Sequence, residues 1–153
     1  MATWSAFEAA APELAEAGHR LLYQFGPGLG YLATVRKDGG PRVHPFCPIV
    51  TDGELWAFIV RGSPKCFDLD RDGRYALHAF PSPEKDDEFA VTGTAVRVRD
   101  PDARDRVIAG TSAQVGEENE ELYRLEVHTA LLAIYEARGV FPPAYARWRD
   151  PSI

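Results

Sequence analysis

The spacing of apolar side chains predicts a helix near the start of the chain. Between Leu14 and Phe25, apolar and small residues recur three and four positions apart, which places them on one helical face. Pro12 suits the first turn of this helix, because the amide hydrogen that it lacks would have no partner there. A Gly-Pro-Gly run at residues 26–28 ends the helix. Residues 1–28 are therefore predicted to form an N-terminal helical segment.

From Gly30 onward, apolar and polar side chains alternate with a period of two, which indicates β-strands. Gly39 and Gly53 mark hairpin turns, because glycine adopts the positive φ that such turns need. Six strands are predicted, at residues 30–36, 41–50, 55–60, 74–80, 89–98 and 122–135. Gly93 lies at the centre of the fifth strand, where a glycine often marks a bend or a close backbone approach.

Two short helices are expected beside the strands. Ser63 and Pro64 open the first, at residues 63–70, and Asp100 caps the second, at residues 100–109. The remaining segments are a polar loop at residues 81–87 and a C-terminal tail at residues 139–153, rich in proline and aromatic side chains.

The order of these elements predicts a mainly β (α+β) fold. Six antiparallel strands in meander order, with peripheral helices, can close into a barrel, and closure removes exposed sheet edges. The regular strand–helix alternation of parallel sheets is missing, as are the glycine-rich loops that bind nucleotide phosphates. We expect a single domain over residues 1–153, because this length suits one domain.

Composition narrows the choice of partners and compartment. The formal net charge is −6 and the sequence pI is about 5.2, so repulsion disfavours nucleic acid and anionic membranes as partners. No apolar stretch approaches the roughly 20 residues of a membrane helix, and the N-terminus has no signal-peptide pattern. Cys47 and Cys66 lie outside any CxxC pair, which indicates reduced thiols and a cytoplasmic protein.

The segment from Phe58 to Lys65 carries the most informative chemistry. A strand leads directly into a helix start, where Ser63 can accept a hydrogen bond from a free backbone amide. Lys65 in the first turn opposes the helix dipole by about 0.3–1 kcal/mol if exposed, and a bound anion reverses that sign. Free amides, the Ser63 hydroxyl, Lys65 and Arg61 would together bind a phosphate. The alternative is a capped surface helix with a solvated lysine.

Arg42 and His44 form a second basic cluster. They share one strand face, because side chains in a strand repeat every two residues. If the second strand neighbours the third in the barrel, Arg42 lies near Arg61 and Lys65. Like charges placed together repel one another unless an anion or a carboxylate is present. The alternative is a solvated basic strand face with His44 half exposed.

Five short motifs follow one another in the chain. They are GPRVHP at 40–45, GSPK at 62–65, LDRDGR at 69–74, VTGTA at 91–95 and RWRDP at 147–151. Each motif is common by itself, but their order and spacing resemble the pyridoxamine 5'-phosphate oxidase-like family of FMN-binding split-barrel proteins. The resemblance extends from about Tyr31 to Val98, with a weaker match in the tail.

This resemblance implies a six-stranded antiparallel split β-barrel that forms a homodimer, with two flavins at the dimer interface. It implies that Arg42, Ser63 and Lys65 hold the FMN phosphate, and that backbone near residues 58–60 lies beside the isoalloxazine ring. The aromatic ring of Trp148 would cover the flavin or seal the dimer seam. The expected cofactor-binding residues are Arg42, His44, Phe58, Ile59, Val60, Arg61, Ser63, Lys65 and Trp148.

Two departures from the family pattern argue against pyridoxamine phosphate oxidation itself. Cys47 stands where the vitamin-processing oxidases carry a second lysine, and Glu88 stands where they offer a glutamine to the flavin. Their pyridoxal phosphate-binding residues are not found as a set. Related split barrels use the 8-hydroxy-5-deazaflavin coenzyme instead, and some bind haem, which is the weaker alternative.

We therefore expect an FMN-dependent oxidoreductase acting on a small organic substrate, in which the flavin does the electron chemistry and the protein positions it. The alternatives are a deazaflavin-dependent reductase of the same fold and a non-catalytic flavin-binding or storage dimer. No catalytic residue is identifiable. The four histidines show no metal-ligand spacing, so no metal site is expected.

Large aromatic side chains give a second reason to expect a homodimer. A six-stranded barrel has room inside for only some of them, and exposed apolar area marks an interface. The rings considered are those of Trp4, Phe7, Tyr31, Trp56, Phe141, Tyr145 and Trp148. Trp56, within a strand, is expected in the core, whereas Trp4 is expected as an interface anchor.

Overall fold

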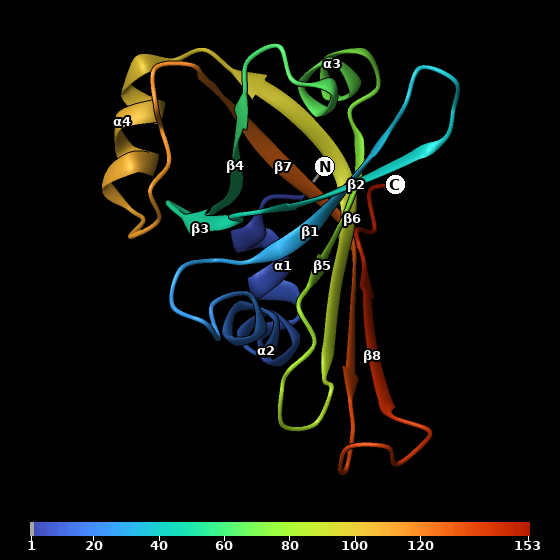
Figure 1. The fold of residues 1–153 in the computed structure, drawn as a ribbon. Coiled ribbons are helices and arrows are strands. Elements are labelled where there is room, and N and C mark those ends of the chain that lie inside the picture. Colours follow the sequence, from blue (N-terminus) through green and yellow to red (C-terminus); the bar gives the residue numbers. More distant parts are fainter. Residues whose placement is uncertain (1) are drawn as a thin grey trace.

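The computed structural model describes residues 2–153, and its strands form one curled antiparallel sheet (Figure 1). The strands are β1 (Gly30–Val35), β2 (Pro41–Phe46), β3 (Ile49–Thr51), β4 (Glu54–Val60), β5 (Arg74–Ala79), β6 (Glu88–Val98), β7 (Glu120–Ile134) and β8 (Ala144–Arg149). The helices are α1 (Trp4–Ala10), α2 (Pro12–Leu22), α3 (Pro64–Arg71) and α4 (Pro101–Ala109).

The sheet closes into a barrel because the two strands at its ends, β2 and β3, are consecutive in the chain. The strand order is β2-β1-β5-β6-β7-β4-β3, and β8 pairs with β7. β2 and β3 follow each other in the chain with only Cys47 and Pro48 between them, so β2 pairs with β1 and β3 pairs with β4. The mainly β, antiparallel split barrel with peripheral helices is thereby confirmed.

The predicted meander order is wrong. A meander would pair β4 with β5, whereas β5 pairs with β1 and β4 pairs with β7. The reason is α3, which carries the chain from the end of β4 across one end of the barrel to β5 (Figure 1). The strand count also differs from six. The predicted second strand breaks at Cys47 and Pro48, where proline lacks an amide hydrogen, and the tail contributes β8.

The N-terminal segment forms two helices rather than one. α2 follows the predicted apolar spacing, but α1 precedes it and is capped by Thr3, whose hydroxyl accepts a hydrogen bond from the Ala6 amide at 3.0 Å. α1 buries Trp4 and Phe7 within this chain, at 2% and 0% exposure. The prediction of Trp4 as an interface anchor is therefore wrong, because its ring packs edge-on against Phe89 in the core.

Two apolar clusters form the core. The larger one fills the barrel and its junction with α1 and α2. The smaller one lies under α4 and joins Val107 of that helix to Ile49, Trp56, Phe58 and Leu122. The prediction that Trp56 is a core residue is confirmed. No helix within residues 2–153 is long and apolar enough to cross a membrane.

Gly93 marks a close backbone approach, as its position within a strand predicts. The register between β6 and β7 shifts between Thr92 and Gly93. A Cβ atom at Gly93 would lie 1.7 Å from the backbone oxygen of Glu126. This bulge allows the long β6 and β7 strands to bend around the barrel.

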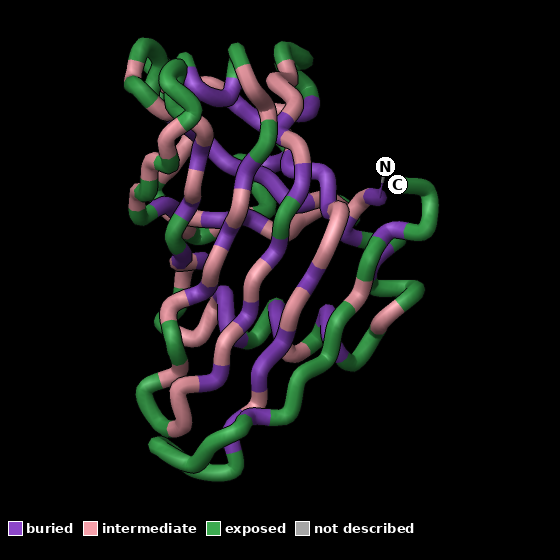
Figure 2. The backbone as a smooth tube through the Cα atoms, turned by 90° about the vertical axis from the view of Figure 1, so that its right-hand side faces the viewer, coloured by how far each residue is buried: buried purple, intermediate pink, exposed green. Residues whose placement is uncertain are grey.

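One broad face of the sheet has no helix over it. Figure 2 looks onto this face, where strands run side by side and β8 is exposed along most of its length. Tyr31 of β1, Val43 of β2 and Tyr145 of β8 are large apolar residues that remain exposed on the strands, at 44%, 61% and 52%.

Candidate functional site

The start of α3 forms one half of the candidate site. Gly62 turns the chain at a φ of +77°, and the Ser63 hydroxyl then accepts a hydrogen bond from the Cys66 amide at 3.3 Å. Pro64 occupies the first turn and has no amide hydrogen. The predicted helix start is confirmed, and Lys65 lies in its first turn.

β2 supplies the other half. Arg42 and His44 lie on one strand face, opposite Thr34 and Leu32 of β1. Burial first, and then the charges of Lys65 and Arg42, lower the pKa of His44, so the neutral imidazole is favoured. The structure thus brings Arg42, His44 and Lys65 together from two separate elements. Together with Ser63, we call them the basic cradle.

Two groups in the basic cradle have no partner. Lys65 is half-buried and has no ion pair or hydrogen bond within residues 2–153. The Nε2 atom of His44 is buried and likewise unbonded in the described part of the chain. Buried polar atoms are normally hydrogen-bonded, so an orphaned one beside an unpaired cation indicates a missing ligand or ordered water.

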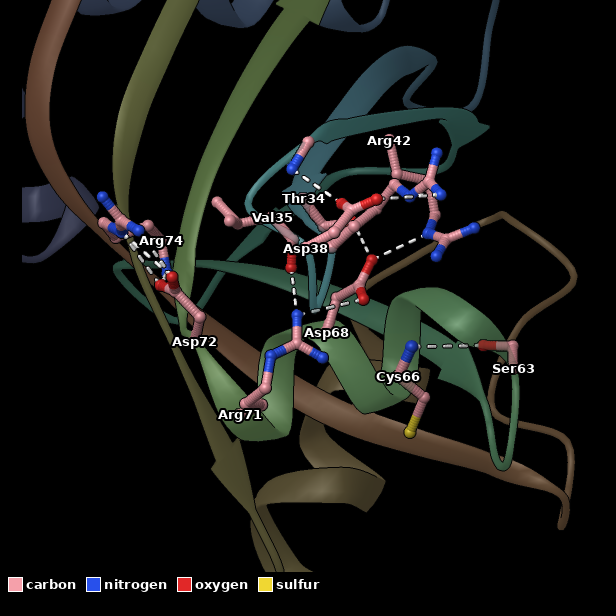
Figure 3. Close-up of polar contacts among 12 residues, drawn as sticks. Thr34, Val35, Asp38, Arg42, Ser63, Cys66, Asp68, Arg71, Asp72 and Arg74 are labelled. Carbon is pink, nitrogen blue, oxygen red and sulfur yellow. Dashed lines mark hydrogen bonds and ion pairs between the residues drawn. The ribbon is translucent and has the colours of Figure 1, made fainter.

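Asp68 of α3 holds Arg42 in place (Figure 3). Its Oδ2 atom accepts hydrogen bonds from Arg42 Nε at 2.7 Å and from the Thr34 hydroxyl at 2.8 Å. Its Oδ1 atom lies 3.3 Å from Arg71 Nη2. Burial alone raises the pKa of Asp68, but these hydrogen bonds outweigh burial and the pKa lies below its ordinary value. The carboxylate contacts Arg42 through Nε, which leaves the two Nη groups available to a ligand.

Sequence reasoning missed Asp68, although a signal was present. The residue is only 2% exposed and directly precedes the buried Leu69 in α3. A buried carboxylate needs a cationic partner. The cluster of basic residues in the sequence needs an anion or a carboxylate beside it, and for Arg42 the structure provides the Asp68 carboxylate.

Comparison with known proteins places this geometry in a family. A sequence model described as pyridoxamine 5'-phosphate oxidase matches residues 19–136, which include the whole basic cradle. The chain belongs to the pyridoxamine 5'-phosphate oxidase family. The resemblance carried by the five motifs is confirmed. No match is found among curated protein sequences.

Solved structures share the fold of this family member at low sequence identity. A heme binding protein from Mycobacterium smegmatis matches with a TM-score of 0.63 and 17% identity, covering 85% of this chain and 57% of that one. This chain therefore spans little more than half of that protein's length. General Stress Protein 26 from Bacillus anthracis str. Sterne matches with a TM-score of 0.61 and 19% identity, covering 87% and 97%. A NimC/NimA family protein from Clostridium acetobutylicum matches with a TM-score of 0.63 and 15% identity, covering 89% and 94%.

Arg61 is engaged outside the basic cradle of this oxidase-family barrel. Its Nε atom lies 2.6 Å from Glu121, and its Nη2 atom donates to the Glu118 carbonyl at 3.3 Å. The hydrogen bond from Arg61 is the main reason that the pKa of Glu121 is lowered, and Arg97 adds to it. The expectation that strand pairing brings Arg42 beside Arg61 is wrong, because β2 pairs with β1 and only β3 pairs with β4.

The segment from Phe58 to Val60, expected beside the flavin ring, has one open backbone edge. β7 pairs with residues 55–60 on one side, whereas β3 reaches only residues 54–56 on the other. Phe58 and Ile59 are buried, and Val60 is 44% exposed. The Arg104 guanidinium covers the Phe58 ring at 5.0 Å from its centroid. The side chains of residues 57–59 are therefore buried, whereas one edge of the backbone at residues 57–60 has no strand partner.

Trp148 lies in β8 and packs on its own chain's core. Its ring centroid is 5.1 Å from that of Phe7. β1, β5, β6 and β7 lie between β8, which carries Trp148, and β2, which carries Arg42 and His44. Strand pairing therefore does not bring Trp148 beside the basic cradle.

The two cysteines are free, and each is partly or fully buried. Burial and then the charge of Glu120 raise the pKa of the half-buried Cys47 thiol. Cys66 lies 3.3 Å from the Tyr123 hydroxyl in the core. A raised thiol pKa disfavours the nucleophilic thiolate. Residues 2–153 contain no group of three or more side chains suited to hold a metal ion.

Proposed function

We propose that this protein is an FMN-dependent oxidoreductase that acts on a small organic substrate and holds the FMN phosphate in the basic cradle. One observation carries the proposal. A half-buried lysine without a counter-charge lies beside a histidine whose buried Nε2 atom has no partner. A phosphate oxygen accepts hydrogen bonds from both an ammonium and an imidazole N–H, so one ligand accounts for both groups.

The residues present fit a phosphate monoester. Lys65 offers an ammonium, and Arg42 offers the two Nη groups that Asp68 leaves unused. The Ser63 hydroxyl already accepts from the Cys66 amide, so its own hydrogen is available for donation. α3 is eight residues long and adds the partial positive charge of its N-terminus.

The open edge of β4 supports the placement of the ring system. Residues 57–60 lead directly into the turn at Gly62 and the capped start of α3, so a ligand held by its phosphate at α3 can extend along that edge. The Val60 carbonyl already accepts a hydrogen bond from the Ser63 amide at 3.1 Å, but the other backbone groups on this edge have no strand partner and can donate to and accept from a polar heterocycle. When bound, the flavin supplies the electron-transfer chemistry, and the chain binds it, orients it and excludes water from one side.

We propose further that the protein is a homodimer with its uncovered sheet face at the interface. Trp4, Phe7 and Trp56 are buried within the chain, whereas Phe141 and Tyr145 are 73% and 52% exposed and are the rings available for such an interface. A second copy would also supply the wall that the open side of the cradle lacks. Sedimentation at micromolar concentration tests this. A monomer that still holds flavin at full occupancy would refute it.

The absorbance spectrum of the purified protein, followed by titration with FMN and riboflavin, tests the function. Oxidised-flavin bands and a clear preference for FMN over riboflavin are expected, because only FMN has the phosphate. A deazaflavin band would select the reductase alternative, and a Soret band would select haem, which one relative binds according to its name. A colourless protein that takes up no FMN would refute the proposal. A bound flavin that no substrate or reductant can reduce would favour the storage dimer.

A further inference from the structure

An open groove adjoins the basic cradle. It measures about 530 Å³, which lies within the roughly 300–1,000 Å³ of small-molecule sites. The hairpin between β1 and β2 forms one wall with Arg36 and Lys37, and α3 forms the other with Phe67 and Arg71. Arg42 belongs both to this groove and to the cradle. We call this hollow the hairpin groove.

The hairpin groove is basic in an acidic protein. Its lining holds four cations and two carboxylates, although the whole chain has a formal net charge of −6. Arg36 pairs with Asp38 at 3.3 Å, and Asp68 is shared by Arg42 and Arg71. Two positive charges remain without a matching carboxylate in the lining. The groove therefore favours an anionic ligand.

Phe67 gives the groove an aromatic wall. The residue is 61% exposed although it lies on α3 between buried Cys66 and buried Asp68. Its ring contributes little to the core of this chain. An exposed aromatic ring beside arginine and lysine side chains is the combination on which proteins stack nucleic-acid bases and hold the neighbouring phosphate.

We infer that the hairpin groove binds a nucleotide, with the base stacked on Phe67 and its phosphate near Lys37 and Arg42. The inference rests on the proposed function, because the cradle fixes the flavin phosphate at the end of the groove that Arg42 lines. Two sources share this chemistry. The nucleotide is either the adenylate half of a flavin dinucleotide, FAD, or the adenylate half of a pyridine dinucleotide that donates electrons.

Four measurements on the full chain test the inference. The first three are the affinities for riboflavin, FMN and FAD, and the fourth is the affinity of the FMN-saturated protein for AMP. Each is repeated with Phe67→Ala and with the conservative Phe67→Tyr. The matched control is Phe25→Ala, which removes another exposed phenylalanine, 46% exposed and outside the groove.

If the nucleotide belongs to the cofactor, FAD binds at least about fivefold more tightly than FMN. This factor corresponds to the lower end of the free energy that stacking of a base on an aromatic ring contributes. Phe67→Ala removes this gain and leaves FMN affinity unchanged, whereas Phe67→Tyr and Phe25→Ala keep it. If the nucleotide belongs to the donor, AMP binds the FMN-saturated protein, and Phe67→Ala weakens it by a similar factor.

The inference is overturned if FAD gains nothing over FMN and AMP does not bind, or if Phe67→Ala changes neither affinity. These results are distinct from failure of the proposed function. A chain that binds no FMN, yet binds AMP in a Phe67-dependent way, would refute the cradle and support the groove. A chain that binds FMN normally but neither FAD nor AMP would support the cradle and refute the groove.

Discussion

Replacing Lys65 by alanine isolates the part of the basic cradle that the protein leaves unpaired. Lys65 is half-buried in the first turn of α3, with no ion pair or hydrogen bond within the described residues. Its charge opposes the helix dipole by about 0.3–1 kcal/mol when no anion is bound. Lys65→Ala should therefore leave the free energy of unfolding of the unliganded protein unchanged or slightly higher.

The same substitution should weaken FMN binding strongly. A hydrogen bond to a charged group contributes about 1.5–3 kcal/mol, which corresponds to roughly a 10- to 150-fold loss of affinity. Riboflavin has no phosphate, so its affinity should change by less than about threefold. The pKa of His44 should also rise, because the Lys65 charge is the second cause, after burial, that lowers it.

Fluorescence titration of FMN and riboflavin measures both affinities, and NMR titration of the imidazole measures the pKa of His44. Lys85→Ala is the control, because Lys85 lies in the loop between β5 and β6 and its contact is with Asp87 at 3.6 Å. If Lys65→Ala leaves FMN affinity intact, or lowers FMN and riboflavin affinity equally, the cradle does not hold the phosphate.

Three further predictions concern the scaffold. Asp68→Asn should lower the free energy of unfolding by about 2–4 kcal/mol in urea titrations, because it leaves Arg42 and Arg71 without their buried counter-charge; a loss below about 0.5 kcal/mol would contradict the role of Asp68 in holding Arg42. Burial raises the pKa of Asp68, but hydrogen bonds from Arg42, Thr34 and Arg71 hold it below its ordinary value of 3.8. The ionised Asp68 therefore stabilises the fold above pH 3.8, and this stabilisation is lost as the pH falls through the pKa of the folded state. The stability of Asp68→Asn should depend less steeply on pH below about 4 than that of the unchanged protein. Gly93→Ala should lower the free energy of unfolding by about 3 kcal/mol or more, because its Cβ would meet the Glu126 backbone oxygen at 1.7 Å. Gly40→Ala should lower it by less than about 1 kcal/mol, because the nearest atom to its Cβ is the flexible Asp38 Oδ1 at 3.0 Å. Equal losses would refute the backbone explanation.

Local patterns determined where most of the helices and strands lie. The period-two alternation and the flanking glycines predicted β1, β4, β5 and β6 to within one or two residues, because strand periodicity is a property of neighbouring positions. The Ser63–Pro64 cap located α3 for the same reason, since a cap acts within one helical turn. The five motifs then identified the family before any pairing of strands was known.

Only the tertiary structure decided how those elements meet. Strand order depends on hydrogen bonds between distant segments, and the crossover through α3 put β5 beside β1 instead of β4. β8 gave no clear signal, because it is almost wholly exposed and is held as a strand by pairing with β7. Asp68 joined Arg42, and Glu121 joined Arg61, across 26 and 60 positions of sequence. A chain's local pattern specifies which residues carry charge, but the fold selects which charges pair and which, like Lys65, remain available to a ligand.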